Sequence, residues 1–117
     1  MAIERGDIEA RVRKYYAEGR YARPDVVERG RERVAVYTLP GRLTAGTVLQ
    51  IGPREYRVER EAYLVFIDLM HLANFAHPVV YELHDANDGS VTTIDEEFPL
   101  SNRELEDRLV PLVSPKE

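Results

Sequence analysis

The chain has 117 residues, of which 44% are apolar and 32% charged, and its net charge is −5. This size and composition predict one globular domain over residues 1–117 and exclude a disordered or fibrous chain. Cysteine is absent, which excludes disulfides, thiolate zinc sites and a cysteine nucleophile.

Charge is distributed unevenly along the chain. Residues 1–60 contain 13 Lys/Arg against 9 Asp/Glu, whereas residues 61–117 contain 3 against 12. If the two halves formed separate faces, the resulting dipole would orient a partner or support self-association. We favour the alternative, in which the halves interdigitate and neutralise each other within one fold.

The first residues carry no apolar stretch typical of a signal peptide, and no apolar run approaches the ~20 residues that a membrane helix needs. We therefore expect a cytoplasmic protein without a membrane partner.

The N-terminal segment predicts a helix over residues 7–18. Asp7 is the expected N-cap, Gly19 is the expected stop, and an apolar stripe is formed by Ile8, Val12, Tyr15 and Tyr16. Arg23-Pro24-Asp25 predicts either a turn or the start of a short second helix, with Pro24 close to its first helical position.

From residue 33 onward the apolar period changes to two, which is typical of strands. A strand is expected over 34–38, and a hairpin over 47–51 and 55–59 around Gly52-Pro53-Arg54. Residues 63–67 are apolar on both faces, which indicates a central strand. A second hairpin is expected over 79–83 and 91–94, with Asp88-Gly89 in its turn.

A C-terminal helix is predicted by a capping signature. Ser101 is the expected N-cap, Glu104 its capping-box partner, and Leu100 a staple onto Leu105. Because Pro111 follows, this helix should end near residue 110. Together the elements predict an α+β fold: a small, mostly antiparallel β-sheet, forming a roll or a partly open barrel, with an N-terminal helix and a short C-terminal helix packed on it.

The polar loop after the central strand holds the candidate catalytic residues Asp68, His71 and His77. An Asp at a strand end can orient a histidine as part of an acid–base pair. No nucleophile completes a triad, since Ser90 and Ser101 are expected in a turn and a cap. We favour a structural role, in which Asp68 and Asn74 bond the backbone of their own loop.

Metal and cofactor sites are not expected. The histidines and Asp68 are spaced irregularly, without the pairs typical of zinc hydrolases. Residues 85–90 begin like a calcium loop with Glu96 at its twelfth position, but the expected strand over 91–94 favours a plain hairpin turn. No glycine-rich phosphate loop occurs.

Basic residues near the N-terminus, among them Arg11 and Lys14, are candidates for binding phosphates. Acidic residues are interleaved with them and the pI is near 5.3, so ion pairs on a solvated helix are the better account. The nearby tyrosines are expected to pack against the sheet rather than stack on bases. We therefore do not expect a nucleic acid partner.

Asp68, Ala73, Asn74, His77 and Pro78, with Phe75 at an aromatic position, match a strand–loop–strand pattern. Residues 66–81 thereby resemble a motif of bacterial multidomain proteins, some of which carry peptidase domains. In that motif a strand ending in Asp leads through Pro-Gly-Ala-Asn-Trp to His-Pro, whereas here His71 and Leu72 stand in place of Pro-Gly. The resemblance implies a recurring structural clasp and carries no activity.

The leading hypothesis is a noncatalytic protein-interaction or accessory module of a bacterial-type system. Its partner would be another protein or a second copy of the chain, and its candidate binding residues are Asn74, Phe75, Arg11 and Lys14. One alternative is a small acid–base or metal-assisted enzyme that uses Asp68, His71 and His77. The other is a nucleic-acid binder that uses the basic N-terminal segment.

Overall fold

The computed structural model describes residues 3–21, 34–69 and 77–113. Within them the chain forms two helices, α1 (Arg5–Ala17) and α2 (Arg103–Asp107). The strands are β1 (Ala35–Thr38), β2 (Val48–Ile51), β3 (Arg54–Arg57), β4 (Ala62–Asp68), β5 (Val79–Asp85), β6 (Val91–Glu96) and β7 (Val110–Val113).

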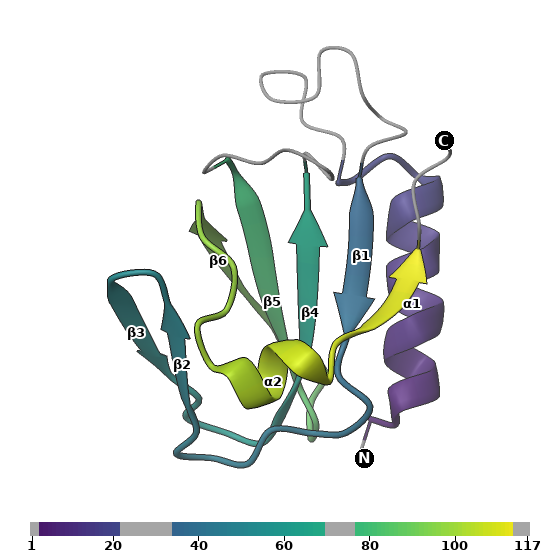
Figure 1. Cartoon of the computed structure of the whole chain (residues 1–117). Helices are drawn as coiled ribbons and strands as arrows, with labels where there is room; N and C mark the ends of the chain where they lie inside the picture. Colours follow the sequence, from purple (N-terminus) through teal and green to yellow (C-terminus); the bar gives the residue numbers. More distant parts are fainter. Residues whose placement is uncertain (1–2, 22–33, 70–76, 114–117) are drawn as a thin grey trace.

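Five of these strands form one antiparallel sheet in the order β6-β5-β4-β1-β7, and β2 and β3 form a separate hairpin (Figure 1). The predicted α+β class, with its two helices, is confirmed. The sheet is open and does not close into a barrel, so it has two edge strands, β6 and β7.

Both faces of the sheet are covered, which explains the continuous apolar run of β4. On one face α1 packs its buried Ile8 and Val12 against Tyr63, Val65 and Ile67 of β4. On the other face the β2–β3 hairpin and α2 cover a second core, which includes Leu49, Ile51, Leu64, Val79 and Tyr81. The fold therefore has three layers, with α1 on one side of the sheet and the hairpin with α2 on the other.

The first helix begins two residues earlier than the sequence predicted. Its N-cap is Glu4, and Asp7 is the third helical residue, whose Oδ2 accepts a hydrogen bond of 2.9 Å from the Glu4 N–H. The prediction of Asp7 as N-cap was wrong, because its carboxylate bonds backward in a capping box. Gly19 stops the helix as expected, with φ of +75°.

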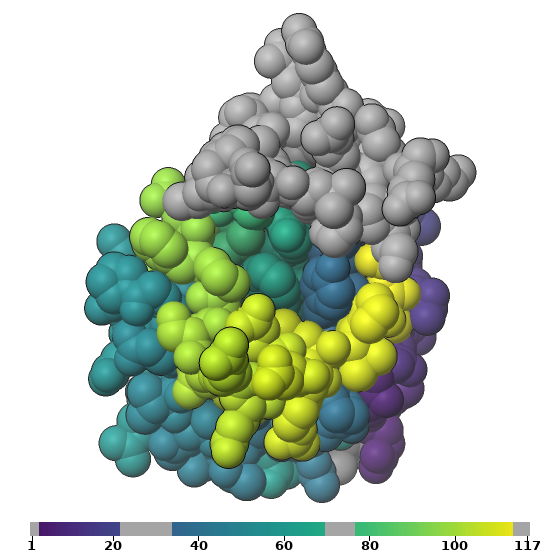
Figure 2. Space-filling view, in the orientation of Figure 1, coloured from purple at the N-terminus to yellow at the C-terminus, as the bar shows by residue number. Residues whose placement is uncertain are grey.

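The C-terminal helix is shorter than predicted and its cap is different. Its N-cap is Asn102 and not Ser101 as predicted. The Ser101 N–H instead donates to the Gln50 carbonyl at 2.7 Å, which joins this segment to β2. The helix ends at Asp107, and residues 110–113 form β7 along β1. Pro111 is tolerated there because an edge strand leaves one side of its backbone unpaired. In the space-filling view α2 and β7 form the band that crosses the front of the molecule (Figure 2).

The two predicted hairpins and the central position of β4 are confirmed. The helix expected near Pro24 lies outside the described residues. None of the described helices is both long and apolar enough to cross a membrane.

Ion pairs join the basic half of the sequence to the acidic half. Arg42 lies 2.8 Å from Glu61, Arg54 lies 3.1 Å from Glu96, and Arg60 lies 3.2 Å from Asp85. Each of these contacts joins one half of the sequence to the other, which supports the expectation that the two halves interdigitate.

Candidate functional site

The loop predicted to hold an acid–base pair is described only at its ends. Asp68 ends β4 and His77 precedes β5, and Asp68 Oδ1 lies 2.7 Å from His77 Nε2. Both side chains are largely buried. His71, Asn74 and Phe75 lie outside the described residues. The structure thus brings together two of the three residues predicted for acid–base chemistry. Their contact joins the end of β4 to the residue that precedes Pro78 and β5.

The two basic candidates on α1 differ in their surroundings. Arg11 Nη1 donates to the Gly89 carbonyl at 2.9 Å and to His84 Nδ1 at 3.0 Å, so this guanidinium holds α1 against the β5–β6 turn. Lys14 is exposed on the same helix. Tyr15 and Tyr16 pack against the core below α1, as predicted. Arg11 therefore serves the fold itself, which weakens the case for a basic binding face.

Three buried polar residues continue from Arg11, and sequence reasoning missed them as a group. His84 Nε2 lies 2.9 Å from Glu82 Oε1, and the Tyr21 hydroxyl donates to the same oxygen at 3.3 Å. His84 is fully buried. A signal was present in the sequence, because Glu82 and His84 are two residues apart in a strand and such residues share one face.

The hydrogen bonds assign the charges in this group. Arg11 can only donate, so the His84 Nδ1 that faces it must accept, and the imidazole is neutral with its proton on Nε2. That proton is donated to Glu82. Burial, together with the neighbouring Glu82 carboxylate, raises the pKa of Tyr21, which keeps its hydroxyl protonated. Among the described residues, no Lys or Arg forms an ion pair with Glu82.

The backbone of β6 presents an open hydrogen-bonding edge. The Asp85 N–H donates to the Ser90 carbonyl at 2.8 Å and the Asp85 carbonyl accepts from the Gly89 N–H at 3.0 Å, so Asp85 bonds toward β6 across a bulge at Gly89 and Ser90. Hydrogen-bonded and non-bonded pairs alternate along an antiparallel ladder, so Thr92 and Ile94 also bond to β5. The N–H and C=O groups of the alternate residues Val91 and Thr93 therefore point away from the sheet. In the described part of the chain, no strand pairs with this side of β6.

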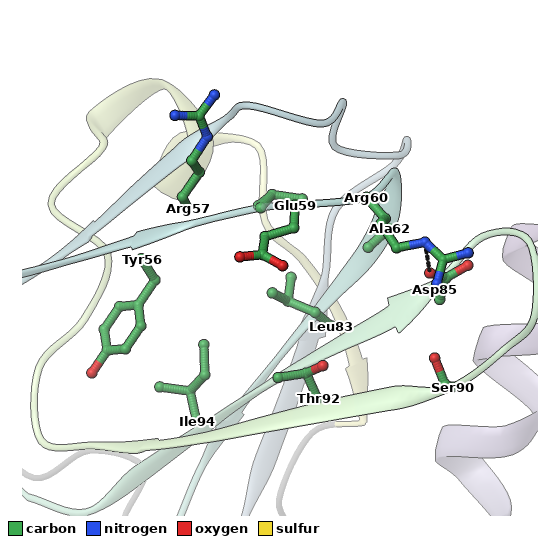
Figure 3. Close-up of a pocket in the computed structure, with 11 residues that line it drawn as sticks. Tyr56, Arg57, Glu59, Arg60, Ala62, Leu83, Asp85, Ser90, Thr92 and Ile94 are labelled. Atoms are coloured by element: carbon green, nitrogen blue, oxygen red, sulfur yellow. Dashed lines mark ion pairs between the residues drawn. The ribbon is translucent and has the colours of Figure 1, made fainter.

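A groove of about 400 Å³ lies beside this edge on the hairpin face of the sheet (Figure 3). Leu83 of β5 and Thr92 and Ile94 of β6 form one side. The segment from Tyr56 to Arg60 forms the other, and the Glu59 carboxylate points into the space between them. The sheet side of the groove thus combines the apolar Leu83 and Ile94 with polar residues such as Thr92 and Ser90. The opposite wall carries Glu59 together with Arg57 and Arg60.

The end of the groove wall is fixed to β6 by a buried carboxylate. Glu96, whose side chain is 2% exposed, accepts hydrogen bonds from the Tyr56 hydroxyl and from Arg54. The Tyr56 bond is the main cause that lowers the pKa of Glu96 below its ordinary value. This contact holds the β2–β3 hairpin at a set distance from the edge strand.

A second cavity, of about 250 Å³, lies beside the same strand on the α1 face. Thr93 and Asp95 of β6 line it together with Glu82, and the remaining lining residues are Tyr15, Arg20, Tyr21, Leu69 and Val80. Arg20 is engaged with Glu18 at 2.9 Å and lies over the Tyr15 ring. Each face of β6 therefore has its own cavity, and the two are lined by alternate residues of the strand.

Comparison with protein-family models, with curated proteins and with solved structures finds no match to this chain. Within residues 3–21, 34–69 and 77–113, no three His, Asp or Glu side chains form a group that could hold a metal ion.

Proposed function

We propose that the protein is a noncatalytic interaction module that binds an extended segment of another protein as an added strand along β6. The observation that carries this proposal is the outward direction of the backbone groups at Val91 and Thr93. Strand addition uses such groups for affinity, and it uses cavities beside the edge for specificity.

The contrast between the two edges of the sheet supports the proposal. Natural proteins protect exposed edges with proline, lysine, bulges or short strands. At the other edge, β7 has four residues, contains Pro111 and shows a register shift opposite Val36 and Tyr37. In β6, six residues run without proline, lysine or a register shift. Protection at one edge and its lack at the other are expected if β6 is kept open for a partner.

Charge indicates the kind of segment that fits. Residues 77–97, which include β5 and β6, contain six Asp/Glu and no Lys or Arg. On the groove wall the Glu59 carboxylate lies among Arg57 and Arg60, so the acidic character of this edge comes from β5 and β6 themselves. A second copy of the chain would bring the same acidic strand to this edge, whereas a basic segment complements it. The proposed occupant is therefore a basic, extended segment of a different protein.

The experiment uses a fluorescein-labelled peptide, Ser-Val-Lys-Val-Lys-Val-Ser, with blocked ends as the probe. Its binding is measured by fluorescence anisotropy on the full chain and on two variants, Thr93→Pro and Thr93→Ala. Both substitutions remove the threonine side chain. Proline also removes the outward backbone N–H, whereas alanine keeps that N–H. We expect Thr93→Pro to weaken binding at least tenfold and Thr93→Ala to leave it within about twofold.

Two outcomes would overturn the proposal. If Thr93→Pro binds the peptide as tightly as Thr93→Ala does, the β6 backbone is not used. Sedimentation of the chain alone at increasing concentration tests the other occupant: self-association that Thr93→Pro abolishes would assign this edge to a second copy.

Acid–base catalysis at Asp68 and His77 is the second candidate, favoured by the 2.7 Å contact between their side chains. Neither residue lines the groove or the cavity beside β6. A screen with hydrolase substrates, run on the full chain and on His77→Gln, tests it: turnover that this variant loses would support catalysis, and turnover that it keeps would exclude His77 as the base.

A further inference from the structure

We infer that the cavity on the α1 face is a pocket for one Lys or Arg side chain of the added strand, held by Glu82. The partner segment then has an apolar–basic–apolar pattern. This inference rests on the proposed strand addition at β6 and specifies which residues the partner must carry.

The first argument is the register of the sheet. Glu82 of β5 pairs with Thr93 of β6. Residues that face each other across strands share one face of the sheet, so the partner residue opposite Thr93 would lie on the α1 face. Its immediate neighbours, opposite Thr92 and Ile94, would face the groove on the hairpin side, where Leu83 and Ile94 supply apolar contacts.

The second argument is reach. Adjacent strands are about 4.8 Å apart, which places the Cα atom of the partner residue about 10 Å from that of Glu82. Between them stands Thr93, whose side chain is short. A long basic side chain that crosses over Thr93 meets the Glu82 carboxylate inside the cavity, whereas a short side chain stops at the rim.

The third argument is the state of Glu82. Its side chain is about nine-tenths buried, and both of its hydrogen bonds, from His84 and from Tyr21, reach Oε1. No hydrogen bond from a described residue reaches Oε2. Since His84 and Tyr21 are neutral donors here, no described residue supplies this largely buried carboxylate with a paired cation, an arrangement that costs free energy until a cation arrives.

The contacts behind Glu82 favour one fixed orientation of its carboxylate. Arg11 holds His84 from the far side of the imidazole, and Gly89 anchors Arg11 in turn. An added Cβ at Gly89 would come within 3.1 Å of Arg11 and 3.2 Å of Ile3, so the turn packs closely on this part of the protein. The carboxylate is therefore oriented before any partner binds.

The test compares two probes on two proteins. In the second peptide, both Lys residues, which lie on one face of the added strand, are replaced by Gln, and both peptides are titrated against the full chain and against Glu82→Gln. We expect the Lys-to-Gln change to weaken binding about tenfold on the full chain and less than twofold on Glu82→Gln. Glu104→Gln, which removes one exposed carboxylate from α2, is the matched charge control and should behave as the full chain does.

The outcomes separate this inference from the proposed function. Equal loss on the full chain and on Glu82→Gln would refute the Glu82 pocket while leaving strand addition intact, provided that Thr93→Pro still weakens binding at least tenfold. If Glu82→Gln does not fold, the Lys and Gln peptides are compared on the unaltered chain in parallel with a Leu version. Equal affinity of the Lys and Leu peptides there would overturn the inference.

Discussion

Two proline substitutions at neighbouring residues of β6 test the assignment of its backbone groups. Thr92 and Thr93 are both exposed threonines on the same strand. The Thr92 N–H lies in the ladder with β5, whereas the Thr93 N–H points to the open edge. Thr92→Pro should therefore destabilise the protein much more than Thr93→Pro, although the two substitutions are chemically identical.

The expected difference follows from the hydrogen bond that only one variant loses. Fixing φ near the proline value costs both variants a similar amount, on the order of 1 kcal/mol. Thr92→Pro also loses a ladder bond and leaves the Leu83 carbonyl without its donor, which adds about 1–3 kcal/mol. The free energy of unfolding should thus fall by about 1 kcal/mol in Thr93→Pro and by about 2–4 kcal/mol in Thr92→Pro.

Urea unfolding followed by circular dichroism measures both values, with Thr92→Ala and Thr93→Ala as controls for the lost side chains. An equal loss of stability in the two proline variants, or a greater loss in Thr93→Pro, would refute the backbone assignment. The proposed binding mode depends on that assignment, so it would fail at the same time.

Three further substitutions test the packing around the groove, each by urea unfolding. Gly52 has φ of +57°, and an added Cβ would come within 2.6 Å of the Phe98 ring, so Gly52→Ala should cost at least about 1–2 kcal/mol. Leu64 is fully buried, so Leu64→Ala should cost about 2–5 kcal/mol. The folded-state pKa of Glu96 is lowered, so its stabilisation is present above about pH 4.5 and is lost as the pH falls further. Glu96→Gln should therefore cost on the order of 1 kcal/mol at pH 7, with the deficit shrinking in acid; a constant deficit would contradict this.

Local patterns in the sequence predicted most of the sheet. The alternation in residues 55–59, the apolar run of β4 and the Asp88-Gly89 turn each depend on neighbours in the chain, and all three were assigned correctly. Strand β7 was missed because its partner is β1, more than 70 residues away, and because Pro111 normally ends an element. Its place on an edge makes the proline acceptable, and strand order cannot be deduced from periodicity.

The candidate site was predicted less well, for a related reason. Asp68 and His77 were recognised as a possible pair because they flank one loop. That β6 is an edge strand depends on the order of the whole sheet, and the contact from Arg11 to His84 joins residues 73 positions apart. Within the buried polar group, only the pairing of Glu82 with His84 could have been predicted from the sequence, because strand alternation places these two residues on one face.

The groove on the hairpin face and the cavity on the α1 face are held by contacts that do not involve the open edge of β6. Glu96 fixes Tyr56 and with it the groove wall, while Arg11 and His84 hold Glu82 on the opposite face. A partner strand therefore meets cavities that need little rearrangement, and the main entropic cost of binding is the ordering of the partner itself. That cost, about 1–2 kcal/mol for each backbone residue that becomes fixed, is large for a short linear segment. Outward backbone bonds offset part of it, about 0.5–1.5 kcal/mol net for each, and they do so for any extended segment because they carry no side-chain information. Discrimination must then come from the side chains that enter the two cavities, which is why alternate residues of the partner, rather than its backbone, decide what this edge binds.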